Sequence, residues 1–344
     1  MAVVTILGAG AMGAALTTPA LAAGNEVRLW GTWLDDDILA ALRAGRPHPR
    51  IDVPIDQSAG LFDSDDLAAA LDGAELVILA ISSDGVVEVL RRAAPHLRPG
   101  LPLLITTKGF GYDPDGKVGL LPPLLRAVLP RELADDCPIV AIGGPCKANE
   151  VAVGRPTAAV FGCADVGVAG RAADLLGTEV YRLATTDDVD GIEASAAMKN
   201  VYAIALGIAD GLAETGGEPW HNLKAATFAQ AATEMQRLAT ALGGRAETAV
   251  GLAGVGDLEV TGLSGRNKVY GARIGRGEPA KTALDEMVAA GQTVEGVAAA
   301  RFAAELAGQR ALDGLPLLGA ITEVLAGAEE PAARITAAVL PVRR

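Results

Sequence analysis

Short apolar runs alternate with Ala- and Leu-rich stretches along the first half of the chain. Short runs rich in Val, Ile and Leu are typical of buried strands, and the longer stretches between them are typical of helices. Strands are predicted at residues 3–7, 26–30, 75–81, 103–107 and 138–142, with a further pair at 157–161 and 178–183. This alternation builds a doubly wound, mainly parallel sheet with helices on both faces.

The pattern changes at Asp187, beyond which apolar residues recur at the helical period of about 3.6 residues and no strand is predicted. Helices are expected at residues 192–213, 223–242, 294–306 and 315–326. Thr186 and Asp187 are residue types that cap helix N-termini, so we place a domain boundary there. An α/β domain is therefore expected over residues 1–186 and an all-α domain over residues 187–344.

The first apolar run leads directly into Gly8-Ala9-Gly10-Ala11-Met12-Gly13, a G-x-G-x-x-G motif that opens a predicted helix. In such a turn the glycines allow a tight bend, close approach of backbone N–H groups to a pyrophosphate, and close packing of helix on strand. The second run ends at Trp30, about where this fold contacts the adenosine ribose. The motif therefore predicts a Rossmann domain that binds a nicotinamide or flavin nucleotide.

Composition narrows the class of protein. With 344 residues the chain is long enough for two cores, and its 21% of charged residues is ordinary for a folded protein. The net charge is −13 and no segment is dense in Lys and Arg, so nucleic acid is not an expected partner. No apolar stretch reaches the about 18 residues of a membrane span, and the first residues lack the basic start of a signal peptide. A cytoplasmic protein is expected.

Cysteines and histidines give no sign of a metal site. The three cysteines form no C-x-x-C pair, and the three histidines are scattered. We expect a reducing compartment and no bound metal. The residues concerned are Cys137, Cys146, Cys163, His48, His96 and His221.

Four clusters are candidates for chemistry. Lys199 and Asn200 lie within an apolar helix, where a buried ammonium needs a polar pocket or an anionic ligand, unless the lysine reaches solvent along the helix surface. A glycine-dense polar loop at residues 254–267 carries Asp257, Thr261 and Arg266 and would suit a phosphate or carboxylate, although an ordinary turn between helices has the same composition. Lys108 and residues 143–150 follow predicted strands, at the sheet edge where ligands bind, or in plain turns.

Together with the glycine motif, these clusters resemble the NAD(P)-dependent glycerol-3-phosphate dehydrogenases, in order over nearly the whole chain. The resemblance implies reversible hydride transfer between NAD(P)H and dihydroxyacetone phosphate, giving sn-glycerol 3-phosphate. The matching residues are Gly8 to Gly13, Leu29-Trp30, Lys108-Gly109, Gly144-Pro145, Ala148, Glu150-Val151, Ile192-Glu193, Met198 to Val201, Gly256-Asp257-Leu258, Thr261, Gly265-Arg266-Asn267 and Glu295-Gly296.

The resemblance also implies roles for residues and a small phosphorylated substrate. Lys199 is the expected acid/base, with Asp257 beside it in the catalytic site, and a homodimer is expected because the family often forms dimers. The implied substrate contacts are Lys108, Gly144, Cys146, Lys199, Asn200, Asp257, Thr261, Gly265, Arg266 and Asn267. The implied cofactor contacts are Gly8, Gly10, Ala11, Met12, Gly13, Trp30, Thr32, Lys108, Ala148, Arg266, Thr293 and Glu295.

The chain also departs from the family pattern. Cys146 stands where a small hydroxyl or amide residue is common, and Lys147, which we expect to face solvent, stands where an apolar residue is usual. Gly31-Thr32-Trp33 offers no arginine for the 2′-phosphate of NADP and no acid at the strand tip, although Asp35 follows closely. The cofactor is therefore NAD or NADP, and the acidic residues 35–37 favour NAD slightly.

Three other interpretations stay open at this point. A ketopantoate or β-hydroxyacid reductase shares the two-domain plan but is not expected to carry the residues from Asp257 to Asn267. A relative acting on a different phosphorylated ketone is compatible with Cys146 and Lys147. A nucleotide sensor without activity would have no use for Lys199 and Asp257.

Overall fold

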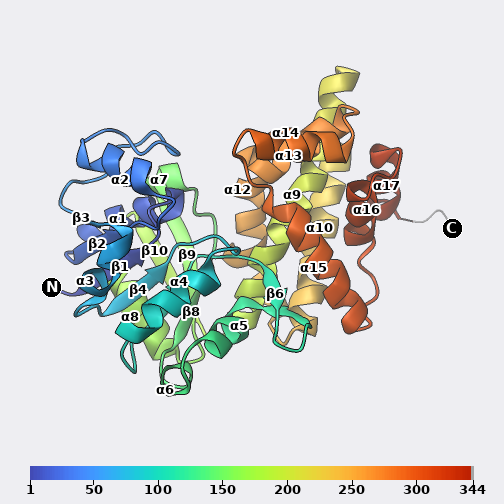
Figure 1. Ribbon diagram of the computed structural model, residues 1–344. Helices are drawn as coiled ribbons and strands as arrows, with labels where there is room; N and C mark the ends of the chain where they lie inside the picture. Colours follow the sequence, from blue (N-terminus) through green and yellow to red (C-terminus); the bar gives the residue numbers. More distant parts are fainter. Residues whose placement is uncertain (342–344) are drawn as a thin grey trace. The chain divides into compact units, whose positions relative to one another are not determined.

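The computed structural model describes residues 1–341, which divide into two compact units (Figure 1). The first unit comprises Met1–Lys108 and Leu121–Val189, and the second comprises Gly109–Leu120 and the chain from Asp190 onward. The expected boundary near Asp187 places residues 109–120 in the α/β domain, whereas here they belong to the second unit. These residues group with the helical unit because three of their apolar side chains, Phe110, Val118 and Leu120, lie in its core.

The first unit is built on an eight-stranded sheet of order β10-β9-β8-β5-β4-β1-β2-β3. Neighbouring strands are parallel except β8 and β9, which are antiparallel, so the predicted doubly wound, mainly parallel sheet is confirmed. The short strand β3 was not predicted, and β10 begins three residues later than expected. The strands are β1 (Val3–Leu7), β2 (Glu26–Trp30), β3 (Gly60–Phe62), β4 (Leu76–Leu79), β5 (Leu103–Ile105), β8 (Ile139–Gly143), β9 (Thr157–Gly162) and β10 (Tyr181–Thr186).

Helices cover both faces of this sheet because its buried strands are apolar on both sides. In β4, Leu76 and Ile78 join the core under one layer of helices, and Val77 and Leu79 join the core under the other. The first layer contains α1 (Ala11–Ala22), α2 (Asp36–Arg43), α7 (Ala148–Ala152) and α8 (Val166–Leu176). The second contains α3 (Leu67–Leu71), α4 (Val86–Ala93), α5 (Leu121–Val128) and α6 (Arg131–Ala134).

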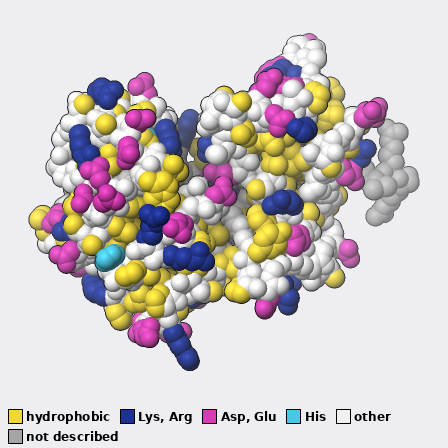
Figure 2. All heavy atoms as spheres, in the orientation of Figure 1, with side chains coloured by type: hydrophobic (Ala, Val, Ile, Leu, Met, Phe, Trp, Pro, Cys, Tyr) yellow, Lys and Arg dark blue, Asp and Glu magenta, His cyan; other side chains and the backbone are white. Residues whose placement is uncertain are grey.

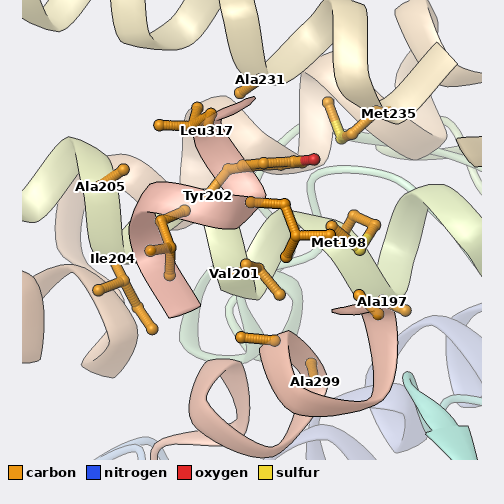
Figure 3. Close-up of a cluster of buried hydrophobic side chains, with 14 of the residues drawn as sticks. Ala197, Met198, Val201, Tyr202, Ile204, Ala205, Ala231, Met235, Ala299 and Leu317 are labelled. Atoms are coloured by element: carbon orange, nitrogen blue, oxygen red, sulfur yellow. The ribbon is translucent and has the colours of Figure 1, made fainter. Parts of the chain in front are cut away.

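The second unit is helical around α9, whose Met198, Val201 and Tyr202 are fully buried in its core (Figure 3). The four predicted helices are present, and α9 is longer than expected at 28 residues. The helices are α9 (Val189–Gly216), α10 (His221–Ala241), α11 (Ala246–Val250), α12 (Asp257–Ser264), α13 (Arg266–Gly275), α14 (Ala280–Ala289), α15 (Glu295–Gln309), α16 (Pro316–Leu325) and α17 (Pro331–Val339). A hairpin of β6 (Phe110–Tyr112) and β7 (Val118–Leu120) completes the unit.

Helices α9 and α13 cross with their backbones in contact. A Cβ atom added to Gly207 would lie 2.1 Å from the carbonyl oxygen of Lys268, and one added to Gly271 would lie 2.0 Å from that of Ile204. Any side chain here would therefore force the helices apart. The crossing contains four glycines: Gly207 and Gly211 on α9, and Gly271 and Gly275 on α13.

Two further properties are the apolarity of the helices and the distribution of charged side chains on the surface. Among residues 1–341, no helix combines the length and the apolarity needed to cross a membrane. Acidic and basic side chains are interspersed over the face drawn in Figure 2.

Candidate active site

A buried ion pair lies at the centre of the helical unit. The Nζ atom of Lys199 on α9 donates a hydrogen bond to Oδ1 of Asp257, the first residue of α12. Lys199 is 9% exposed and Asp257 is 1% exposed. The ammonium thus points to a carboxylate inside the unit, as burial of a lysine requires, and does not reach solvent along the helix surface.

The segment that carries Asp257 is helical, which corrects the prediction of a glycine-dense loop. A π-helical turn (Leu252–Gly256) runs directly into α12, and Gly265 is the single break before α13. The hydroxyl of Thr261 donates to the carbonyl oxygen of Asp257 over 2.7 Å, one turn back along the helix. A high glycine content is typical of loops, but here glycine also serves helix packing: a Cβ on Gly262 would lie 2.8 Å from Cδ1 of Leu206.

Hydrogen bonds of two side-chain amides join three helices next to the ion pair. The Nδ2 atom of Asn267 on α13 donates to Oδ1 of Asn200 on α9 over 3.0 Å. The Oδ1 atom of Asn267 accepts from the backbone N–H of Gly296 on α15 over 2.8 Å. Asn200 and Asn267 are 7% and 6% exposed, so these bonds are shielded from water. The first turns of α13 and α15 are therefore fixed to the turn of α9 that carries Lys199.

Glu295 links these hydrogen-bonded amides to Arg266, the exposed cation of the site. One carboxylate oxygen of Glu295 accepts from Nδ2 of Asn200 at 3.0 Å, and the other lies 3.5 Å from Nη2 of Arg266. The Nη1 atom of Arg266 also donates to the hydroxyl of Thr293 at 2.6 Å. Half of the Arg266 side chain remains exposed, so an anion can approach it.

The glycine turn of the first unit fits a dinucleotide. Gly8 has φ +108°, and a Cβ on it would lie 2.6 Å from the carbonyl oxygen of Ala80. A Cβ on Gly13 would lie 2.0 Å from the carbonyl oxygen of Gly8, so the helix–strand contact also requires glycine. Gly10, Ala11 and Met12 are partly exposed at the start of α1, where the first helical N–H groups lack partners within the helix. These residues could hold the pyrophosphate of NAD(P).

The structure corrects the role expected for Trp30. Its side chain is 0% exposed and packs in the core under α3 and α4, out of reach of a nucleotide. Its carbonyl oxygen accepts from the N–H of Gly8 over 2.8 Å, so Trp30 supports the glycine turn from beneath.

Asp35 is turned toward the protein. Its Oδ2 atom accepts from the backbone N–H and the hydroxyl of Thr32, both at 2.9 Å, and lies 3.4 Å from the N–H of Ala9. Asp35 is 6% exposed. Its carboxylate therefore braces the turn after β2 against the glycine turn, so Asp35 itself gives no support for NAD.

Arg50 is a candidate cofactor residue that the sequence did not reveal. Buried His48 lies with Nε2 2.9 Å from the carbonyl oxygen of Ala9, and its Nδ1 accepts from the N–H of Arg50 at 3.1 Å. This anchor leaves Nη1 of Arg50 3.6 Å from the Cβ position of Gly10, with the side chain exposed. Arg50 lies 40 residues beyond Gly10 in a proline-containing loop, and no local pattern marks it.

Lys108, Gly144, Cys146 and Ala148 follow β5 and β8 within the first unit, as expected. Gly144 has φ +127°, and a Cβ on it would lie 2.9 Å from Cα of Ala159. Cys146 is partly exposed, and its Sγ lies 3.8 Å from the hydroxyl of buried Tyr181. Lys147 is also partly exposed, immediately before α7. No metal-binding group of three or more His, Cys, Asp or Glu side chains occurs in residues 1–341.

Comparisons with known proteins match most of the chain. Residues 3–169 match the model of the NAD-dependent glycerol-3-phosphate dehydrogenase N-terminus, and residues 188–336 match that of the C-terminus. An NADP(+)-dependent glycerol-3-phosphate dehydrogenase from Archaeoglobus fulgidus is 38% identical over 94% of this chain and 95% of its own. A glycerol-3-phosphate dehydrogenase [NAD(P)+] from Thiobacillus denitrificans is 39% identical over 93% and 92%.

A solved structure is similar over the whole chain. The glycerol-3-phosphate dehydrogenase of Coxiella burnetii has a TM-score of 0.82 and 30% sequence identity, with 98% of each chain covered. The family models together span both units, and the relatives are matched over nearly their full length. The chain therefore belongs to the NAD(P)-dependent glycerol-3-phosphate dehydrogenase family.

Proposed function

We propose that this protein reduces dihydroxyacetone phosphate to sn-glycerol 3-phosphate with NAD(P)H, and catalyses the reverse reaction. The observation that carries the proposal is the buried Lys199–Asp257 pair, which supplies a charged proton donor within the helical unit. Membership of the family supports the same reaction, as do the names of two relatives at 38% and 39% identity, both of which are glycerol-3-phosphate dehydrogenases.

Lys199 acts as the acid in this proposal. Bound NAD(P)H supplies the hydride for C2 of the ketone. The Lys199 ammonium hydrogen-bonds the carbonyl oxygen, stabilises the negative charge that develops there, and donates the proton. Asp257 holds the ammonium in place, and Thr261 ties the first turn of α12 together by its bond to the Asp257 carbonyl. In the reverse direction the neutral amine accepts the alcohol proton.

Arg266 is the proposed partner of the substrate phosphate, because its guanidinium is half exposed and suits a bidentate contact. The first residues of α13, which follow Gly265, add backbone N–H groups to the same place, whereas the N–H of Gly265 itself donates to the carbonyl oxygen of Thr261. Both polar atoms of the Asn267 side chain bond to Asn200 and Gly296, so Asn267 is proposed to position α13. Asn200 holds Glu295, which together with Thr293 orients Arg266.

The remaining predicted residues serve the cofactor unit. Gly8, Gly10 and Gly13 with Ala11 and Met12 are proposed to bind the pyrophosphate, and Thr32 the adenosine ribose. Lys108 is proposed to contact both cofactor and substrate, with Gly144, Cys146 and Ala148 along the same sheet edge. A homodimer stays a prediction from the family resemblance, and a cytoplasmic location stays a prediction from the sequence.

The test is loss of nicotinamide absorbance with purified protein and dihydroxyacetone phosphate, run in parallel with NADH and NADPH. Turnover is expected, and Lys199→Ala should lower kcat by at least about 100-fold while nucleotide binding persists. Unchanged turnover in this variant would remove Lys199 from the mechanism. Binding of both nucleotides without oxidation of either would favour a different ketone or a sensor.

A further inference from the structure

The hairpin of residues 109–120 interrupts the cofactor unit. The chain leaves that unit at Lys108, forms β6 and β7 within the helical unit, and returns at Leu121, where α5 begins. Gly109, the first residue of the excursion, has φ +140°, a conformation that glycine adopts far more readily than other residues. The chain therefore passes from the first unit to the second at the peptide bond between Lys108 and Gly109.

Contacts to one face of α15 anchor the hairpin (Figure 1). The hydroxyl of Tyr112 donates to Oε2 of Glu305 over 2.8 Å, and the Tyr112 ring meets that of Phe302 edge-on with centroids 5.1 Å apart. The N–H of Val118 donates to Oε1 of Gln309 over 3.2 Å. Positions 302, 305 and 309 recur at helical spacing, so they present a single surface to the hairpin.

The hairpin is also fixed internally. Phe110, Val118 and Leu120 are 3%, 5% and 6% exposed in the core of the helical unit. At the tip, Oδ1 of Asp113 accepts from the backbone N–H groups of Asp115 and Lys117 over 2.9 and 2.8 Å. A short, doubly anchored hairpin has few conformations, so its first residue has a defined place in the helical unit.

Helix α15 also begins at the candidate active site. Glu295 and Gly296, which bond to Asn200 and Asn267, form the first turn of α15. Phe302 lies seven residues further along, about 10 Å at 1.5 Å per residue. One rigid helix therefore carries both the site contacts and the anchor of the segment that begins immediately after Lys108.

We propose that the hairpin is a positioning element for Lys108 and that Tyr112 is its positioning residue. Anchored on α15, the hairpin fixes the Lys108–Gly109 junction and so limits where the Lys108 ammonium can lie during the reaction. The inference rests on the proposed function, in which Lys108 contacts cofactor and substrate. It predicts that a change at Tyr112, which is itself 49% exposed, acts on turnover through Lys108.

A double-mutant cycle on the full chain tests this coupling. Tyr112→Ala should lower kcat/KM for dihydroxyacetone phosphate about tenfold, since a displaced group near the chemistry is costly. In a Lys108→Ala background, Tyr112→Ala should lower kcat/KM less than about twofold, because the lysine through which it acts is no longer present. Tyr112→Phe, which keeps the ring and loses only the bond to Glu305, should show a smaller loss with the same dependence on Lys108.

Trp220→Ala is the matched control, as Trp220 is a similarly exposed aromatic residue of the helical unit, at 44%. It should leave kcat/KM within about twofold in both backgrounds. The inference would be overturned if Tyr112→Ala lowered kcat/KM by the same factor with and without Lys108. It would also be overturned if Trp220→Ala lowered kcat/KM as much as Tyr112→Ala does. Absence of turnover in the unmodified protein would instead overturn the proposed function, and the inference with it.

Discussion

Two buried carboxylates of the helical unit have different partners. Asp257 bonds to an ammonium, whereas Glu234 on α10, which is 0% exposed, accepts hydrogen bonds only from neutral donors among the described residues. The donors to Glu234 are Tyr202, Gln230 and the backbone N–H groups of Leu317 and Leu318. Burial raises the pKa of the Glu234 carboxyl. Asp257 thus pairs with the proposed acid, whereas Glu234 joins α9, α10 and the start of α16.

Glu234→Gln is expected to destabilise the protein by about 1–3 kcal/mol, because its amide N–H groups would face donors. Since the native pKa of Glu234 lies above its ordinary value of 4.5, the folded state holds a proton that the unfolded chain releases. The contribution of Glu234 to stability is therefore full below that value and falls as the pH rises through the native pKa. Denaturant unfolding at several pH values measures this, and exposed Glu218→Gln should change stability little at any pH.

Arg50 is expected to strengthen the binding of either nucleotide. Its guanidinium lies beside Gly10 in the turn proposed to hold the pyrophosphate, so Arg50→Ala should raise the Kd of NADPH and that of NADH by a similar factor of about tenfold. Calorimetric titration with each nucleotide measures the two effects. Arg46→Ala, an exposed arginine of the same loop, should change neither. Weakening of NADPH alone would contradict this expectation and assign Arg50 to the 2′-phosphate instead.

Among the elements, the crossing of α9 and α13 decides the site geometry. Lys199 and Asn200 lie two turns before Gly207 on α9, and Asn267 lies one turn before Gly271 on α13. The backbone contact at the glycines therefore sets how closely the site-bearing turns of the two helices approach. The bond between Asn200 and Asn267 at 3.0 Å depends on that approach.

Gly271→Ala is expected to destabilise the protein by about 3 kcal/mol and to lower activity, because its methyl group would overlap the carbonyl oxygen of Ile204. Thermal unfolding and kcat/KM measure the two effects. Gly319 of α16 is the control, since no atom lies within 4 Å of its Cβ position. Gly319→Ala should stabilise the protein by about 0.5–1 kcal/mol, as expected in an open helical position. Similar behaviour of the two variants would disprove the importance of the crossing.

For the whole molecule, the chain passes between the two units at 108/109, 120/121 and 189/190. A fragment of residues 1–189 would contain the hairpin without the helical core that buries Phe110, Val118 and Leu120. The three apolar side chains would then be exposed to water, at a cost of about 1.5–3 kcal/mol for each large side chain that loses its burial.

The fragment 1–189 is therefore expected to aggregate or to bind a hydrophobic dye. Replacing residues 109–120 with a short Gly-Ser linker should give a soluble fragment that still binds nucleotide, since Phe110 and Leu120 are paired and the two ends of the excursion lie close together. Light scattering and nucleotide titration compare the two fragments. Equal solubility would mean that the hairpin does not need the helical unit.

The sequence predicted the parts of this structure that are governed by local pattern. The strands, the glycine turn and the four long helices follow from apolar periodicity, and Lys199 was identified by its apolar neighbours. Contacts between distant segments were missed, because nothing near Arg50 marks its approach to Gly10 and nothing near Phe110 marks the unit in which it is buried. The burial of the Trp30 side chain could not be predicted for a different reason: position at a strand end does not reveal which side of the sheet a side chain faces.

The glycine crossing also has an entropic consequence. Where α9 meets α13, the contact is made by backbone atoms and glycines, which have no rotamers to rearrange when a ligand arrives. The ordering of the glycine backbone is completed when the protein folds. If Arg266 binds the substrate phosphate as proposed, the phosphate meets helices whose spacing is already fixed, and its binding energy is not consumed in drawing them together.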